Sequence, residues 1–521
     1  MNTLLYKPVK PTRASKKSAL CAVIMLGFVF SSCGSKQTAP QPQEPPVVVP
    51  PVIQPPISTA LPVVIDFTRT ADAGSALNQE LIGGYSPQKW VNASKIYDKA
   101  NVLDALSLPF SKVNLPNVTN IASDGTWNDI NDGGQPSQRS ILTSLVSAGV
   151  GIHLGIETVP AALRGDAAKV QKIFNTSLTK VRGYIGNDVE IYYEILNEPE
   201  LAAASVEWGY YPDFELFWKD FLNAYIALAN KRLTDPNLKI GGPGFELTRW
   251  MTQFISKLTD PATNKVQLSD GSTQTIDLDF ISYHNYLNWD DNPIAQSNIQ
   301  TAIDKMNTFY NAVAAYRTSH ASVKLFCTEY SWLKSPFNAI NDAANNSYRS
   351  CARTLELTKL AIEQLPRTNR FYWAQTMGQG FGGGDDYFTL QNYDWDSKKY
   401  RYRSGAYALW MYQRMPASRS YMTFDGTKLN GFASAAGGRY YLAVWNRTGT
   451  AQSIQLNLSN INTANLNYDM YAINSNTFNY SASSAFGNAK TPAITKTGAA
   501  STIGEITLEK EATIYIELYV K

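Results

Sequence analysis

Between about residues 61 and 415 the sequence alternates short apolar segments with longer amphipathic ones. The short segments, such as the one that begins at Glu190, have the length and the β-branched and aromatic content of buried strands. The longer segments place apolar residues three and four positions apart, as Phe214–Ile226 does, which is typical of helices packed on a sheet. This alternation predicts an α/β fold, a parallel sheet closed into a (β/α)₈ barrel. An open doubly wound sheet is the alternative, but no Gly-x-Gly-x-x-Gly follows the first expected strand.

The expected elements can be given by residue. We expect strands at Leu61–Phe67, Ser111–Leu115, Val150–Ile156, Glu190–Leu196, Leu238–Gly242, Ile276–His284, Val323–Glu329 and Arg370–Gln375. We expect helices at Gln138–Ala148, Ala162–Ile185, Phe214–Ile226, Leu247–Leu258, Ile299–Tyr316, Asn346–Gln364 and Ser404–Tyr412.

The sequence changes character after Met415, which ends the expected barrel domain at residues 61–415. Short alternating strands separated by Asn, Gly, Ser and Thr predict an all-β sandwich over residues 416–521. We expect this C-terminal domain to cap the barrel rather than to act as a separate carbohydrate-binding module. The strand at Leu61–Phe67 could also join it.

The N-terminal 60 residues look like a secretion signal and a tether. A basic segment precedes the apolar run Ser18–Phe30, which is too short to span a membrane and typical of a signal peptide. Ser31-Ser32-Cys33-Gly34 then resembles a bacterial lipoprotein signal, so residues 1–33 are expected to be the signal, with Cys33 lipidated, for instance by palmitate. A plain secretory signal or an uncleaved anchor is the alternative. Residues 34–60 are Pro-rich and predict a disordered tether that holds the protein on the outer membrane or the periplasmic face of the cell envelope.

Composition and charge narrow the possible partners. The net charge is +3, and removal of the five Lys and Arg residues in the signal leaves −2, so we expect no nucleic-acid partner. The sequence has no His-Glu-x-x-His and no Cys-x-x-Cys, so we expect neither a metal nor a cofactor. We expect a monomer.

The strand that begins at Glu190 ends in Asn197-Glu198-Pro199. Pro199 cannot continue a central strand, which leaves Asn197 and Glu198 at its C-terminal end. That end of a parallel barrel carries the catalytic residues. A carboxylic acid there, beside an amide that can bind a hydroxyl, suits proton transfer to a glycosidic oxygen. An ordinary polar turn is the alternative.

A second carboxylate, Glu329, ends the expected seventh strand, whereas Glu198 ends the fourth. Both would open on the same face of a barrel. Two carboxylates about 5 Å apart make a retaining glycosidase, and a gap of roughly 6.5–9.5 Å makes an inverting one. A salt bridge at the end of a strand is the alternative role for Glu329.

Other strand ends supply candidate sugar ligands. His284 and Tyr286 end the sixth strand, where His284 could bind a sugar hydroxyl or the acid carboxyl and Tyr286 could donate to Glu329. Trp373 on the eighth strand could form a floor for the sugar ring, or could simply pack in the core. Glu157 ends the third strand and is a weaker candidate.

Two further residues are placed by strand alternation. Glu194 should point into the barrel below Glu198, and therefore needs a cationic or hydrogen-bonding partner. Cys327 should also point inward, whereas Cys351 lies on the following helix, so we expect no disulfide between them.

Together these motifs resemble glycoside hydrolase family 39. The resemblance rests on Leu-Asn-Glu-Pro (196–199), Leu-Lys-Ile-Gly-Gly-Pro-Gly (238–244), Phe-Ile-Ser-Tyr-His-Asn-Tyr (280–286) and Cys-Thr-Glu-Tyr (327–330), with Gly-Ile-Glu-Thr-Val-Pro (155–160) as a looser match. It implies a retaining clan A glycosidase, with Glu198 as acid/base and Glu329 as nucleophile. It also implies Asn197, His284 and Tyr286 as substrate ligands.

The sequence therefore predicts an enzyme that hydrolyses a polysaccharide or oligosaccharide, such as a bacterial exopolysaccharide, by double displacement. In that mechanism Glu198 should have a raised pKa while Glu329 stays ionised. Another clan A activity, such as that of a β-xylosidase or an endoglucanase, is an alternative. So is a non-catalytic glycan-binding or envelope-structural lipoprotein on a barrel scaffold.

Overall fold

A computed structural model of the chain describes most of the protein beyond the N-terminal segment. The described residues are 59–71, 82–85, 109–115, 120–129, 138–201, 210–289, 294, 296–334, 348–363, 367–374, 377–378, 391–394, 399–478 and 491–520. All of them belong to one compact unit, Ser58–Lys521. The signal peptide, the lipidation site Cys33 and the Pro-rich tether lie outside the described residues. Among the described residues, no helix is both long and apolar enough to cross a bilayer.

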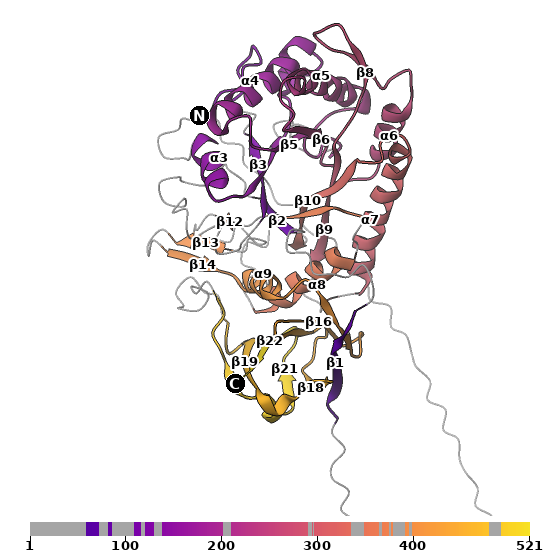
Figure 1. The fold of residues 1–521 in the computed structure, drawn as a ribbon. Helices are drawn as coiled ribbons and strands as arrows, with labels where there is room; N and C mark the ends of the chain where they lie inside the picture. The colour runs from indigo at the N-terminus through magenta and orange to yellow at the C-terminus, as the bar shows by residue number, and fades with distance from the viewer. Residues whose placement is uncertain are drawn as a thin grey trace, which may run out of the picture. The chain divides into compact units, whose positions relative to one another are not determined.

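Eight parallel strands close into a barrel, which confirms the predicted fold class (Figure 1). Their order around the barrel follows the chain, apart from a short hairpin formed by β7 (Lys265–Gln267) and β8 (Thr273–Thr275). The barrel strands are β2 (Ile82–Tyr85), β3 (Phe110–Leu115), β4 (Gly151–Ile156), β5 (Ile191–Ile195), β6 (Leu238–Gly241), β9 (Phe280–Trp289), β10 (Lys324–Lys334) and β11 (Arg370–Ala374).

Amphipathic helices cover the outside of the barrel, close to where the sequence predicts them. Two begin with an aspartate whose side chain accepts a backbone N–H of the first turn, Asp166 from Lys169 and Asp213 from Leu216. The helices are α3 (Gln138–Ser147), α4 (Ala167–Ile185), α5 (Phe214–Arg232), α6 (Met251–Thr259), α7 (Gln296–Arg317), α8 (Arg349–Glu363) and α9 (Ser404–Arg414).

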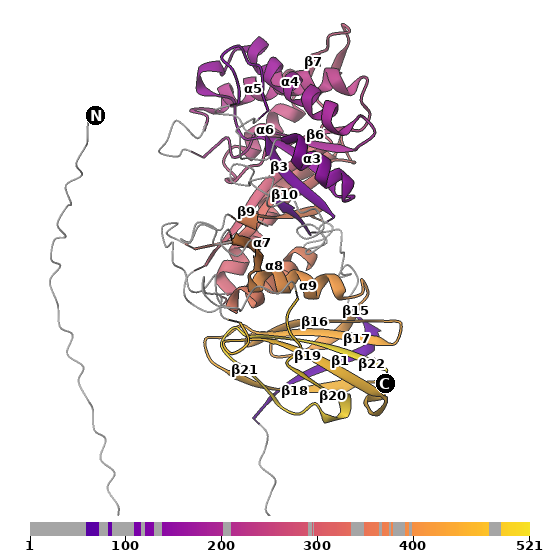
Figure 2. The same cartoon turned by 90° about the vertical axis from the view of Figure 1, so that its left-hand side faces the viewer.

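The C-terminal region forms one mixed sheet of nine strands (Figure 2). Strands from both ends of this sheet contribute to a single apolar cluster, in which Val63, Leu456, Tyr468 and Ile516 are buried. The sheet therefore curls over its own core in the manner of a sandwich. In order, its strands are β20 (Lys496–Ala499), β19 (Leu466–Ile473), β22 (Thr513–Val520), β17 (Arg439–Asn446), β16 (Leu429–Ala436), β15 (Arg419–Thr423), β1 (Leu61–Thr70), β18 (Gln452–Ser459) and β21 (Ile506–Leu508).

The first expected strand does not belong to the barrel. β1, drawn in indigo among the orange and yellow strands, pairs antiparallel with β15 and parallel with β18. The boundary at residue 61 is therefore corrected: the first barrel strand is β2, whose Gly83 and Gly84 give it no strand-like pattern of apolar residues. The sequence alternative in which Leu61–Phe67 joins the C-terminal domain is the one observed. A small sheet of β12 (Met377–Gly378), β13 (Gln391–Asp394) and β14 (Lys399–Tyr402) follows the barrel.

The inside of the barrel is filled in layers. Five buried rings close its lower part, where Phe280 and Phe326 stack with centroids 4.9 Å apart; the others are Phe110, Tyr192 and Tyr372. Above this apolar layer the inward side chains are charged. The chemistry of the molecule is therefore concentrated at the C-terminal ends of the strands.

Candidate active site

The turn after β5 holds Glu198 on the rim of the barrel. Leu196 and Glu198 have positive φ angles of 65° and 45°, a region that residues other than glycine seldom adopt. Backbone hydrogen bonds to both neighbouring segments keep the turn in this shape. Asn197 N–H donates to the Glu157 carbonyl (2.9 Å), and Glu198 N–H donates to the Gly244 carbonyl (2.8 Å). A strained turn held from both sides is typical of a functional position.

The Glu198 carboxyl lies in a largely buried site beside a histidine. His284 Nδ1 is 2.7 Å from Glu198 Oε1, and the glutamate side chain is 19% exposed. Burial raises the pKa of Glu198 to about 7, although the cations Lys112 and Lys305 act in the opposite direction. Burial also lowers the pKa of His284 to about 4, so this histidine is neutral at neutral pH. Glu198 can therefore hold a proton at pH 6, as a general acid must.

A lysine and a tyrosine hydroxyl contact the carboxylate of Glu329. Lys112 Nζ is 3.4 Å from Glu329 Oε1, and the Tyr286 hydroxyl donates a short hydrogen bond to Glu329 Oε2. Both contacts stabilise a negative charge. The carboxylate is therefore placed where a nucleophile needs its developing and departing charge supported.

The two carboxylates are close together. His284 Nδ1 lies 2.7 Å from Glu198 Oε1 and 3.6 Å from Glu329 Oε2. Because both distances share one atom, their sum of 6.3 Å is the upper limit for the separation of those two oxygens. This closeness is compatible with the roughly 5–5.5 Å between the carboxyl groups of retaining glycosidases.

A β-bulge turns Glu329 toward the inside of the barrel. Cys327 pairs with Tyr283 and Glu329 with His284, so Thr328 is an extra residue on β10. Simple alternation from the inward-facing Phe326 would point Glu329 at the helices, and the extra residue reverses this. β10 also does not end at Glu329 as predicted, since β9 and β10 remain paired as far as Trp289 and Lys334.

The same bulge corrects the prediction for Cys327. This residue lies outside the barrel interior, within the large core cluster that also contains Cys351. Both cysteines are buried and free. Strand alternation would place Cys327 on the same side as Glu329 only if Thr328 were an ordinary strand position.

Lys112 on β3 is the partner that Glu194 requires. Its Nζ lies 2.9 Å from Glu194 Oε1 and 3.0 Å from Asn197 Oδ1, and the side chains of Lys112 and Glu194 are 0% and 1% exposed. Burial works against the charge of Lys112, but Glu194 and Glu329 raise its pKa above the ordinary value. Glu194 also contacts His153 Nε2 at 3.2 Å. A lone lysine within an apolar strand is the sequence signal for this buried cation, which was not predicted.

The other predicted site residues differ in their contacts and burial. Asn197 accepts from Lys112, and Glu157 accepts a 3.5 Å hydrogen bond from Asn114 Nδ2. Trp373 is only 3% exposed and belongs to the core cluster, so its role as a floor for the sugar remains a prediction. The half-buried Tyr210 was missed; burial raises its pKa, and so do the charges of nearby carboxylates, Glu198 first among them.

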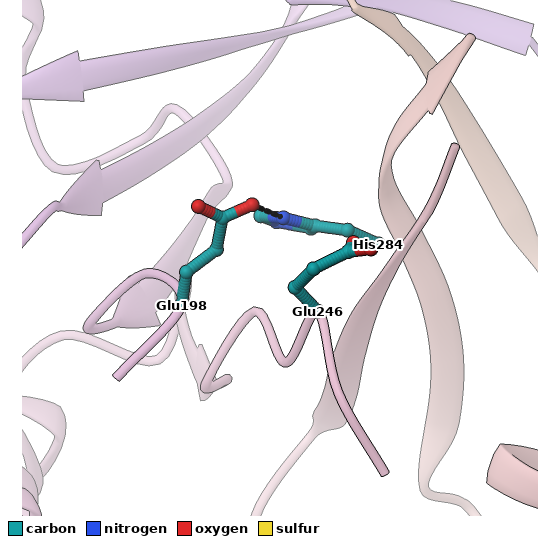
Figure 3. Close-up of side chains that lie close together, drawn as sticks. All are labelled: Glu198, Glu246 and His284. Carbon is teal, nitrogen blue, oxygen red and sulfur yellow. Dashed lines mark hydrogen bonds and ion pairs between the residues drawn. The ribbon is translucent and has the colours of Figure 1, made fainter. Parts of the chain in front are cut away.

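A further carboxylate, Glu246, lies beside Glu198 and His284 (Figure 3). One potential ligand atom from each of these three residues lies within 4.8 Å of the others, a spacing that could hold a metal ion. A protein cation is already present, because Lys305 Nζ contacts Glu246 Oε1 at 2.8 Å. Burial raises the pKa of Glu246 to about 7. The cluster therefore adds a second carboxyl group that titrates near neutral pH.

Comparison with known proteins fits this geometry. Residues 180–355, which include both Glu198 and Glu329, match the model of glycosyl hydrolases family 39. Over this part, the chain is similar to glycosyl hydrolase family 39. The protein is therefore a glycosidase, of the retaining clan A type. No curated protein sequence matches the chain.

Solved structures show the same fold at low sequence identity. A monomeric β-xylosidase from Caulobacter crescentus CB15 has a TM-score of 0.59 at 13% identity, over 88% of this chain and 100% of that one. A family 39 enzyme from Xanthomonas axonopodis pv. citri has a TM-score of 0.59 at 12% identity, over 89% and 98%. A family 51 α-L-arabinofuranosidase from Thermotoga petrophila RKU-1 has a TM-score of 0.60 at 12% identity, over 88% and 100%. At such identities the likeness establishes the fold, and this glycosidase need not share a substrate with any of them.

Proposed function

We propose that this family 39 glycosidase cleaves a polysaccharide or oligosaccharide by double displacement, with Glu198 as acid/base and Glu329 as nucleophile. The observation that carries the assignment is the position of His284 Nδ1, in reach of both carboxylates, which limits the distance from Glu198 Oε1 to Glu329 Oε2 to 6.3 Å. At that spacing one sugar carbon can be attacked by one group while the other protonates its leaving oxygen.

In the first step Glu198, protonated below its pKa of about 7, gives its proton to the glycosidic oxygen. Glu329 attacks the anomeric carbon, and the bond to the leaving sugar breaks. The product is a glycosyl ester on Glu329. His284 Nδ1 contacts Oε1 of Glu198, which leaves Oε2 free to carry the proton toward the substrate.

In the second step Glu198 is a carboxylate and takes a proton from water, which attacks the anomeric carbon and releases Glu329. Esterification of Glu329 removes a negative charge from the site, so the pKa of Glu198 is lower in the intermediate. Lys112 and the Tyr286 hydroxyl then stabilise Glu329 as it regains its charge.

We further propose that the enzyme is lipid-anchored at Cys33 and works in the cell envelope, on a polysaccharide at or near the cell's own surface. The support is the signal-like segment at residues 1–33 and the Pro-rich segment at 34–60. Incorporation of radiolabelled palmitate into the full chain, and its absence from a Cys33→Ala variant, would test the anchor.

A fluorinated sugar with a good leaving group tests the catalytic roles. It should trap the ester on Glu329, and peptide mass analysis should find the label on that residue. Glu198→Gln should lose at least a hundredfold in activity on natural glycosides but little on aryl glycosides that need no acid, since general acid catalysis contributes about 10²–10⁴. Glu215→Gln, which changes an exposed glutamate on α5, is the control and should have full activity. A label on another residue, or full activity of Glu198→Gln on natural glycosides, would refute the assignment.

A further inference from the structure

The nine-stranded sheet contains a gap between β15 and β16. β15 remains paired to β1 from Asp66 to Val64, but it pairs to β16 only at Arg419–Ser434 and Ser420–Ala433. Beyond these two pairs, the described partner of β16 is β17. The two strands therefore separate, and the sheet opens next to α8.

This gap forms a cavity of about 260 Å³. At about 30 Å³ per water molecule, the cavity could hold several waters or one sugar ring. Its apolar part comes from Tyr421, Met422 and Phe424. Gly431 lines it at a closely packed point, where a Cβ would lie 2.9 Å from Met422 Cε and 2.6 Å from the Ala443 carbonyl oxygen.

Two cations, Lys359 and Arg419, line the same cavity, against one exposed glutamate, Glu363. Arg419 Nε and Nη1 are buried, and neither has a hydrogen-bond partner among the described residues. Lys359 donates to Asn430 and lies 3.8 Å from Glu363 Oε1. Buried guanidinium donors without an acceptor are costly, and a bound anion would satisfy them.

We propose that this cavity is a second carbohydrate site, which binds a carboxylate-bearing sugar of the polymer. The carboxylate would accept from Arg419 and Lys359, and the ring would lie against Tyr421 or Phe424. The excess of positive charge selects an anion. The apolar lining and the volume favour a sugar acid over a bare inorganic ion. That the ligand is a sugar rests on the proposed action on a polysaccharide. That the cavity binds an anion is independent of that action.

The cavity is separate from the catalytic centre. α8 follows β10 and leads back to the start of β11, so its C-terminal end, with Lys359 and Glu363, lies toward the opposite end of the barrel from Glu329. The two sites share no lining residue among those described. A polymer bound here would be held near the enzyme without occupying the catalytic centre.

Calorimetric titration of the full chain tests the proposal. Glucuronate and galacturonate are the acidic probes, methyl glucoside is the neutral one, and inorganic phosphate is the simple anion. We expect saturable millimolar binding of at least one acidic sugar, weaker binding in higher salt, and at least tenfold weaker binding in Arg419→Met and in Lys359→Met. Lys428→Met, on an exposed lysine in the turn between β15 and β16 that does not line the cavity, is the matched control and should bind normally.

Three results would overturn the proposal: binding unchanged in both cavity variants, methyl glucoside binding as tightly as the acids, or phosphate binding more tightly than either. Activity on an aryl glycoside separates this question from the catalytic one. The two cavity variants should retain that activity, which also shows that they fold. If the variants lose acid binding but remain active, the second site is supported. If the unmodified protein has no glycosidase activity but binds the acid through Arg419, the proposed catalytic roles are wrong and the second site is still supported.

Discussion

At the scale of single residues, Lys112 is the group on which the buried charges depend. It lies between Glu194 and Glu329 with no solvent exposure. Lys112→Met should lower the free energy of unfolding by about 3–5 kcal/mol, because it leaves Glu194 charged and buried without its main partner. It should also lower kcat/KM, because Glu329 loses a cation.

The double variant Lys112→Met/Glu194→Gln separates these two effects. Removal of both charges should restore much of the stability lost in Lys112→Met, whereas activity should stay low because Glu329 still lacks its cation. Urea unfolding and aryl-glycoside kinetics on the same preparations provide the measurement. A double variant less stable than Lys112→Met would show that Glu194 is not the charge that destabilises the single variant.

The pH dependence of the reaction is also set by single residues. Since Glu198 must be protonated in the first step and has a pKa of about 7, activity on natural glycosides should fall as pH rises through 7. Lys305 lowers the pKa of Glu198, so Lys305→Met should move this basic limb to higher pH, by on the order of one unit. Lys257→Met, at an exposed ion pair between α6 and α5, should leave the profile unchanged. A downward shift in Lys305→Met would contradict the electrostatic account.

At the scale of elements, the turn after β6 must pass very close to the catalytic residues. A Cβ on Gly244 would lie 2.6 Å from His284 Nε2 and 2.9 Å from Glu194 Oε1. Gly244→Ala should therefore displace His284 from Glu198, lower kcat/KM at least tenfold and cost about 1–3 kcal/mol of stability. Gly183→Ala is the matched control, because Gly183 lies within the exposed part of α4 with open space around it. The free energy of unfolding of this control should rise by about 0.5–1 kcal/mol.

Elements with a clear apolar period were predictable from the sequence, and short or irregular ones were not. α5 and α7 lie where Phe214–Ile226 and Ile299–Tyr316 predict them, because each buries one apolar face. β2 was missed because Ile-Gly-Gly-Tyr carries no pattern, and its place in the barrel is fixed by pairing to β11 and β3. The sequence indicated that Glu198 and Glu329 would face one another, but it did not indicate the bulge at Thr328. The bulge depends on how β10 pairs with β9, which strand alternation in the sequence does not show.

At the scale of the whole molecule, buried ion pairs and hydrogen bonds join α8 to the nine-stranded sheet. Arg353 Nε donates to Glu511 Oε1 at 2.7 Å, and Glu356 Oε2 accepts from Trp445 Nε1 at the same distance. Removal of one partner of a buried ion pair lowers the free energy of unfolding by about 3–5 kcal/mol. The barrel and the nine-stranded sheet should therefore not unfold independently. We therefore expect the sheet to be a structural part of the glycosidase rather than an appended module.

Because β1 comes from the N-terminal end of the described chain, this coupling can be tested by two N-terminal truncations, one that keeps β1 and one that removes it. Removal of residues 1–58 should leave thermal unfolding and aryl-glycosidase activity unchanged, since the site is built from residues after β2 begins at Ile82. Removal of residues 1–71 also takes β1 from between β15 and β18, which breaks the order of the sheet and exposes Leu456 and its apolar neighbours. That variant should unfold at a markedly lower temperature. On heating, it should lose its activity at the temperature at which the sheet unfolds. If both truncated proteins unfolded at the same temperature, the sheet would not need its N-terminal strand, and residues 416–521 would be a domain in their own right.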